Sequence, residues 1–198
     1  NLMTSEKEVQ ALIENWVPFC IDFVERGEKP KNRHIKSPDR TDLESHIGGK
    51  CPLCSQTMVA PRKGLTKKGS SPHRPNDFSI EHIVPLAMGG NNLRENLIQM
   101  CHKCNDARNV VMGRLLPKLA PLSKPPIRGR KLSDSNRSKI SRYIEWVIVT
   151  IHAPNSANLD KELCQIFDVF KGEDVYESGV ITTPISTVSS SESTELLD

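Results

Sequence analysis

Apolar residues recur at helical spacing near the N-terminus and again in the second half of the chain. Ser5 and Glu8 form a capping box at the start, and Gly27 is a typical helix stop. The periodic apolar positions of this first helix are Val9, Leu12, Ile13, Trp16, Val17 and Cys20. Further helices are predicted over 133–150 and 158–170. Their apolar faces hold Ile140, Tyr143, Ile144 and Val147, and then Leu159, Leu163, Ile166, Phe167 and Phe170.

The pattern changes in the middle of the chain. Residues 78–85 are rich in β-forming side chains and end at a proline, so they predict a strand. The sequence Gly-Gly-Asn-Asn at 89–92 is typical of a turn, and the apolar run 97–100 predicts a second strand. A helix is expected from 102 to about 116, ending near Pro117. The predicted order is therefore strand, loop, strand and helix.

Basic and proline-rich segments join these elements. We interpret 29–40 as a basic connector, 117–130 as an extended proline-rich segment and the residues from 177 onward as a loose Ser/Thr/Glu-rich tail. The predicted organisation has four parts. They are an N-terminal helical segment (1–28), a core (29–116), a basic linker with C-terminal helices (117–175) and a flexible tail (176–198).

Four of the six cysteines occur in two Cys-x-x-Cys pairs, Cys51 with Cys54 and Cys101 with Cys104. Four thiolates at this spacing suit a closed, structural zinc site. The 46 residues between the pairs exceed the spacing of about 15–20 in many zinc ribbons, so the metal would clamp an insertion. Two disulfides or four unrelated buried thiols are the alternatives. The lone Cys20 and Cys164 lie among apolar residues and are expected in the core.

Charge is unevenly distributed, although the net charge is only +3. Residues 29–76 hold 11 basic against 3 acidic residues, and residues 103–142 hold 11 against 2, whereas residues 151–198 hold 2 against 9. Basic segments of this kind suit phosphate contacts. The candidate contacts are Arg62, Lys63, Lys67 and Lys68, in a loop that would otherwise be merely solvated. Aromatic residues make up only 5% of the chain, which argues against recognition by base stacking.

Several spaced motifs occur in an order that identifies a family. The run Glu81-His82-Ile83-Val84-Pro85 is followed by Gly89-Gly90, Asn96-Leu97 and Cys101-x2-Cys104-Asn105. Together they resemble the HNH endonuclease family, over roughly residues 51–112. The resemblance implies an α+β protein with a zinc-stapled ββα-metal core and flanking α-helices.

The same resemblance assigns roles by position. His82 matches the general base, and Asn96 matches the residue that fixes the loop and orients that base. Glu81 matches one ligand of the catalytic metal. Asn105 stands where the family more often has a histidine ligand, so the three motif residues His82, Asn96 and Asn105 make this chain an HNN variant. Oxygen ligands favour Mg²⁺ or Mn²⁺. Arg108, one turn beyond, would contact phosphate or only solvate the helix.

These roles have structural alternatives. Asn96 would also serve as a turn cap, and Asn105 as a helix-start residue. Glu81 and His82 are neighbours on a predicted strand and therefore point to opposite faces. The resemblance implies that a local twist or bulge lets both reach one phosphate.

The expected function is a metal-dependent DNA endonuclease with structural zinc and catalytic Mg²⁺ or Mn²⁺. Its partner would be duplex DNA, held mainly by backbone contacts, with a homodimer or a larger complex as the assembly. The family implies a bacterial or phage context such as restriction or phage defence. The sequence shows no membrane span or signal peptide, so we expect a cytoplasmic protein. The alternatives are a zinc-stabilised nucleic-acid-binding module without catalysis, and an RNA-directed nuclease.

Overall fold

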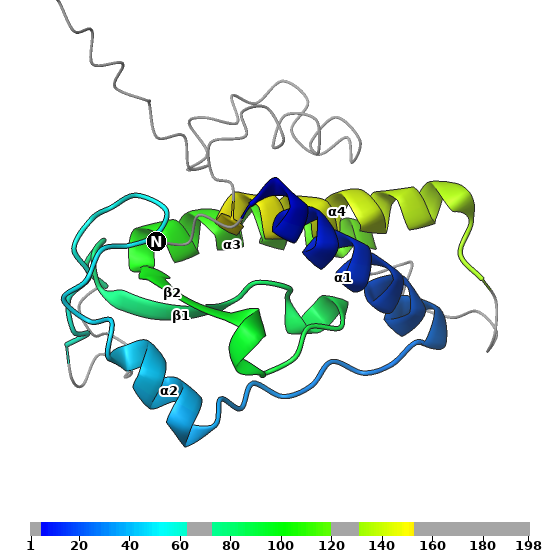
Figure 1. The fold of residues 1–198 in the computed structure, drawn as a ribbon. Coiled ribbons are helices and arrows are strands. Elements are labelled where there is room, and N and C mark those ends of the chain that lie inside the picture. Colours follow the sequence, from blue (N-terminus) through cyan, green and yellow to red (C-terminus); the bar gives the residue numbers. More distant parts are fainter. Residues whose placement is uncertain (1–4, 63–72, 120–130, 153–198) are drawn as a thin grey trace, which may run out of the picture.

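The computed structural model describes residues 5–62, 73–119 and 131–152. In these parts the chain forms helices around a two-stranded antiparallel sheet, so the α+β expectation is confirmed (Figure 1). The elements in order are α1 (Glu6–Arg26), α2 (Ser37–Glu44), β1 (Phe78–His82), β2 (Leu97–Cys101), α3 (His102–Leu119) and α4 (Asp134–His152). The predicted helix at 158–170, Cys164 and the tail lie outside the described residues.

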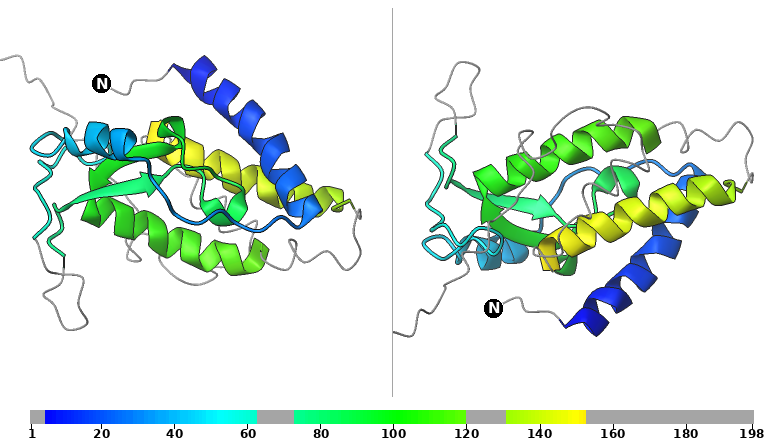
Figure 2. Two further views of the ribbon diagram at one scale, coloured as in Figure 1. Left: turned by 90° about the horizontal axis from the view of Figure 1, so that it is seen from below. Right: turned by 90° about the horizontal axis from the view of Figure 1, so that it is seen from above.

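Helices α1 and α4 pack together and form the helical part of the core (Figure 2). As predicted, α1 begins with the Ser5–Glu8 capping box and ends at Gly27, whose φ is 63°. Pro18 lies inside this helix. The buried face of α4 consists of Ile140, Tyr143, Ile144, Trp146, Val147, Ile148 and Ile151. Burial of apolar side chains at about 25 cal/mol per Å² is the main stabilising term for this pairing.

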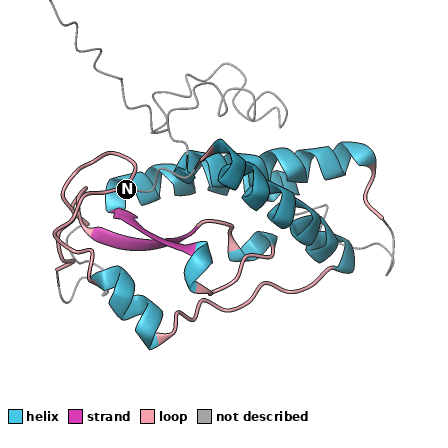
Figure 3. Ribbon diagram, viewed as in Figure 1, coloured by secondary structure: helices cyan, strands magenta, loops and turns pink. Residues whose placement is uncertain are grey.

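The hairpin is held in one register, with Phe78 opposite Cys101 and His82 opposite Leu97. Strand β1 ends at His82 and is thus three residues shorter than predicted. The Ile83 amide still bonds the Asn96 carbonyl, and the Val84 amide then bonds the Asn96 side chain in place of a backbone partner. Figure 3 shows that the segment between the strands contains two short helical turns, at Leu86–Met88 and Arg94–Asn96.

Helix α3 follows β2 directly, which completes the predicted order of strand, loop, strand and helix. Helix α3 ends close to the predicted position, but it runs through Pro117 as far as Leu119. Leu115 and Leu119 are both buried, so packing of the last turn outweighs the backbone hydrogen bond that proline removes.

The basic connector at 29–40 is also shorter than predicted, since residues 37–40 form the first half of α2. Pro38 stands in the first turn of this helix, where a missing amide donor costs little. The remaining connector runs beneath the hairpin in the view of Figure 1, between α1 and α2. Its backbone at Asn32 and His34 forms hydrogen bonds with the side chain of Asn92, in the loop between the strands. No helix within the described residues is long and apolar enough to cross a membrane.

Candidate active site and metal centre

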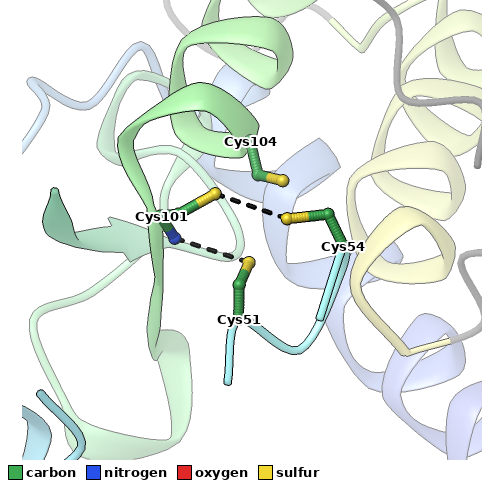
Figure 4. A group of neighbouring side chains, drawn as sticks. All are labelled: Cys51, Cys54, Cys101 and Cys104. Atoms are coloured by element: carbon green, nitrogen blue, oxygen red, sulfur yellow. Dashed lines mark hydrogen bonds between the residues drawn. The ribbon is translucent and has the colours of Figure 1, made fainter. Parts of the chain in front are cut away.

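The two Cys-x-x-Cys pairs come together in space. Figure 4 shows the four sulfur atoms of Cys51, Cys54, Cys101 and Cys104 facing one another. These atoms all lie within 4.8 Å of one another, and the Cys54 and Cys101 sulfurs are 3.6 Å apart. The four sulfurs of a tetrahedral site with Zn–S bonds of about 2.3 Å lie about 3.8 Å apart. The cluster therefore fits one zinc ion, and 3.6 Å is far too long for a disulfide.

The chemistry of the cluster also favours a bound cation. Hydrogen bonds that the Cys104 thiol donates to the Cys101 and Cys51 sulfurs, together with burial, raise the pKa of Cys104. Several thiolates would therefore repel one another here unless a cation neutralised them. The Cys101 amide points at the Cys51 sulfur at 3.4 Å, as donors do around thiolate ligands.

The zinc cluster and the predicted catalytic histidine occupy opposite ends of the hairpin. Cys101 pairs with Phe78 at one end, and His82 pairs with Leu97 at the other. Four residue steps along a strand span about 13 Å. The predicted base His82 is thus remote from the cysteine cluster, whereas the predicted metal ligand Asn105 directly follows Cys104. A zinc ion bound by the four cysteines would hold the hairpin, α3 and the 51–54 turn together.

The two predicted ligands of the catalytic metal lie on the facing sides of β1 and α3. Ser79 and Glu81 alternate along β1 and share one face. The Asn105 amide donates to the Ser79 hydroxyl, and Arg108, one helical turn further along α3, pairs with Glu81 at 3.6 Å. The Asn105 oxygen accepts from Asn109 at 2.6 Å, so the Asn105 side chain is held at both ends.

Arg108 has a different role from the predicted one. Its side chain is only 1% exposed, and its guanidinium donates to the carbonyls of Ile83 at 2.9 Å and Val147 at 3.1 Å. It also pairs with the Glu81 carboxylate. Because its guanidinium is enclosed in this way, Arg108 is not available to DNA. The predicted contact between Arg108 and phosphate is therefore wrong. Arg108 instead connects α4 and α3 to the end of β1.

His82 lies on the other side of β1 and contacts Asn92. Its Nε2 atom is 3.0 Å from the Asn92 Oδ1 atom. Burial lowers the pKa of His82, and the nearby Arg33 charge acts in the same direction, whereas the Asn92 hydrogen bond opposes it. The net effect is a lowered pKa, which favours a neutral imidazole in His82. Glu81 faces Arg108 of α3 and His82 faces Asn92, so the two side chains point to opposite sides of β1, as strand geometry predicts. The bulge that the resemblance implied is not seen, because the register of β1 is regular through His82.

Glu81 is also withdrawn from water, with its side chain 12% exposed. Burial raises the pKa of this carboxyl, and the charges of Arg108 and Arg33 oppose the rise. Arg33 comes from the connector, and its guanidinium donates to the Ile80 carbonyl at 2.7 Å. It therefore places a positive charge beside both predicted catalytic side chains. In the sequence Arg33 is one of several basic residues of the segment 29–76, and no motif distinguishes it from the others.

Asn96 contacts the loop backbone rather than the imidazole. It is 1% exposed, accepts from the Val84 amide at 2.8 Å and donates to the carbonyls of Val84 and Asn91 at 3.0 and 2.9 Å. This arrangement fits the loop-fixing part of its predicted role. The amide that touches His82 belongs to Asn92, which the sequence had placed in a turn without assigning it chemistry.

Of the four basic residues predicted for the DNA-binding loop, the structure describes Arg62, which is exposed. Lys63, Lys67 and Lys68 lie outside the described residues.

Comparison with known proteins and families gave a match over part of the chain. Neither the curated proteins nor the solved structures gave a match to the chain. The sequence model of the HNH endonucleases matches residues 71–111, which include β1, β2, the second cysteine pair and the first half of α3. The match to a family of nucleases indicates a nuclease-type function and a nucleic-acid substrate. The resemblance is thereby confirmed for residues 71–111, which match the sequence model of the HNH endonucleases.

Proposed function

We propose that the chain is a metal-dependent endonuclease that hydrolyses phosphodiester bonds of duplex DNA, with His82 as the general base. One observation carries the proposal. Within the segment matching the HNH endonucleases, strand β1 ends in a buried imidazole with one nitrogen hydrogen-bonded, and the same strand presents a largely buried carboxylate. The zinc cluster at the other end of the hairpin would then be structural.

The environment of His82 supports its role as a base. Because burial lowers its pKa, the imidazole is largely unprotonated at neutral pH and can accept a proton from water. The water oxygen then forms a bond to phosphorus, and the bond to the leaving oxygen breaks. The family pattern implies a 5′-phosphate and a 3′-hydroxyl as the products. One chain carries one such site, so a monomer would nick and a dimer would cut both strands.

Glu81 and Asn105 would hold the catalytic metal. Both offer oxygen atoms, and their contacts with Arg108 and Ser79 place them along the same interface between β1 and α3. Oxygen donors suit Mg²⁺ or Mn²⁺, and the raised pKa of the buried Glu81 carboxyl reflects a charge that a cation would stabilise. When bound, the ion supplies positive charge against the phosphate and the leaving group.

Basic side chains near the site would bind the DNA backbone. Arg33 lies beside the proposed catalytic residues, and Arg62 is exposed at the start of the basic loop. Contacts of this kind are weakened by salt and carry little sequence information. Replacing Lys63, Lys67 and Lys68 together by alanine should therefore weaken binding to every duplex alike and reduce the salt dependence of binding.

The experiment is cleavage of supercoiled plasmid by the zinc-loaded chain, with Mg²⁺, with Mn²⁺ and with a chelator that leaves zinc bound. The proposal expects nicking only when the divalent metal is added. DNA binding without cleavage would favour a zinc-stabilised binding module, and faster cleavage of a matched RNA would favour an RNA-directed nuclease. Either result would overturn the proposal.

A metal titration tests the two ligands. Asn105→Ala should raise the metal concentration needed for half-maximal cleavage, while Asn105→His should keep some activity. The matched control is Asp106→Ala, since Asp106 is the exposed neighbour on the same helix. An unchanged metal requirement in Asn105→Ala would show that Asn105 only serves the start of α3.

A further inference from the structure

The contact between His82 and Asn92 fixes more than the position of the ring. Neutral imidazole carries its proton on one of two nitrogens, and the partner of one nitrogen selects the tautomer. An amide side chain can select either tautomer, because its oxygen accepts a hydrogen bond and its nitrogen donates one. The orientation of the Asn92 amide therefore decides which His82 nitrogen carries the proton.

Two backbone groups of the connector fix that orientation. The Asn92 nitrogen lies 3.0 Å from the carbonyl oxygen of Asn32, which can only accept. The Asn92 oxygen lies 3.3 Å from the backbone amide of His34, which can only donate. A flipped amide would place oxygen against oxygen and nitrogen against nitrogen, and it would lose both hydrogen bonds. The Asn92 oxygen is therefore the atom that faces His82.

The consequence for the ring follows from this orientation. An oxygen acceptor 3.0 Å from Nε2 requires a proton on Nε2. In the neutral ring the lone pair is then on Nδ1. We propose that Asn92 is a positioning residue that holds His82 in the Nε2–H tautomer, so that Nδ1 is the atom that accepts the proton from water. This inference rests on the proposed function of His82.

The arrangement suits a full catalytic cycle. When Nδ1 takes a proton from water, the imidazolium keeps its Nε2–H bond to Asn92, so the ring need not turn. The water oxygen forms the bond to phosphorus with its released electron pair, and the leaving oxygen departs with the pair of the broken bond. The connector between α1 and α2 acts through Asn92, because Asn32 and His34 offer only backbone groups to the Asn92 amide.

Two measurements test the proposal on the full zinc-loaded chain. Long-range proton–nitrogen-15 spectra distinguish a protonated ring nitrogen from an unprotonated one, and the His82 signals are assigned by their loss in His82→Ala. Wild type should show protonated Nε2 and unprotonated Nδ1, and Asn92→Ala should show a mixture of tautomers. A protonated Nδ1 in wild type, or the same tautomer in Asn92→Ala, would overturn the proposal.

Cleavage kinetics supply the second measurement. Asn92→Ala should lower kcat on the order of 10–100-fold, the size typical of losing an outer partner, with KM for plasmid DNA nearly unchanged. Asn92→Asp keeps an acceptor for the Nε2 proton but places a second oxygen against the Asn32 carbonyl, so it should recover kcat only in part. Asn91→Ala is the matched control from the same loop and should keep wild-type kcat. If wild type cleaves and Asn92→Ala has full kcat, the positioning role fails although the function stands. If wild type does not cleave, the proposed function fails and the spectra alone decide the tautomer.

Discussion

Replacement of Asn96 by alanine should destabilise the loop that follows the strand carrying the base. The side chain is almost fully buried and makes three hydrogen bonds to the loop backbone. Without it the buried Val84 amide has no acceptor, which costs about 1–3 kcal/mol, and each of two carbonyls loses a bond of net value about 0.5–1.5 kcal/mol. The expected loss in the free energy of unfolding is on the order of 2–6 kcal/mol.

A near-isosteric variant sharpens the test. Asn96→Asp keeps an oxygen for the Val84 amide, but it places a second oxygen against the carbonyls of Val84 and Asn91, which lie 3.0 and 2.9 Å from the amide nitrogen. Two acceptors cannot share a hydrogen bond when the carboxylate is ionised. Asn96→Asp should therefore be no more stable than Asn96→Ala, although the side chains of asparagine and aspartate are almost the same size.

The assay is urea unfolding at a fixed zinc concentration, followed by the fluorescence of buried Trp146. Asn91→Ala is the matched control, because its side chain only accepts from the exposed Leu93 amide at 3.1 Å. It should cost less than about 1.5 kcal/mol. If Asn96→Ala loses no more stability than Asn91→Ala, the buried hydrogen bonds do not hold the loop and the reasoning is refuted.

Three other predictions concern the scaffold. Gly90→Ala should lower the free energy of unfolding by about 1–3 kcal/mol or more, because a Cβ there would lie 1.9 Å from the Val84 carbonyl oxygen. Gly113→Ala, with open space around its Cβ, should stabilise α3 by about 0.5–1 kcal/mol, and thermal unfolding compares the two. Cys104→Ser should lower both the zinc content by elemental analysis and the melting temperature, and retained zinc would contradict a four-cysteine site. Burial raises the pKa of the Cys20 thiol to about 12, so iodoacetamide should modify it only after unfolding.

Local signals in the sequence were enough for much of the fold. The capping box and Gly27 predicted the limits of α1. A run of β-forming residues ending at a proline, a turn and a short apolar run predicted the hairpin. The paired cysteines predicted a cluster that the structure assembles. In these cases the pattern reflects contacts between near neighbours, or ligands whose spacing is characteristic by itself.

The errors arose where distant parts of the chain decide the outcome. Arg108 was expected to contact phosphate or solvent, yet its guanidinium is enclosed by the carbonyls of Ile83, just after β1, and Val147 of α4. Pro117 looked like a helix end, yet burial of Leu119 carries α3 past it. Asn92 meets the connector about sixty residues earlier in the chain, and such a contact leaves no periodic trace in the sequence.

The central claim is that His82 activates the attacking water. The most direct test is the single-turnover rate of DNA cleavage by His82→Ala beside wild type, with zinc content and urea midpoint matched. Loss of a positioned base should reduce the rate by about 10²–10⁴-fold while both controls stay unchanged. A His82→Ala preparation that is folded, zinc-loaded and as fast as wild type would contradict the account.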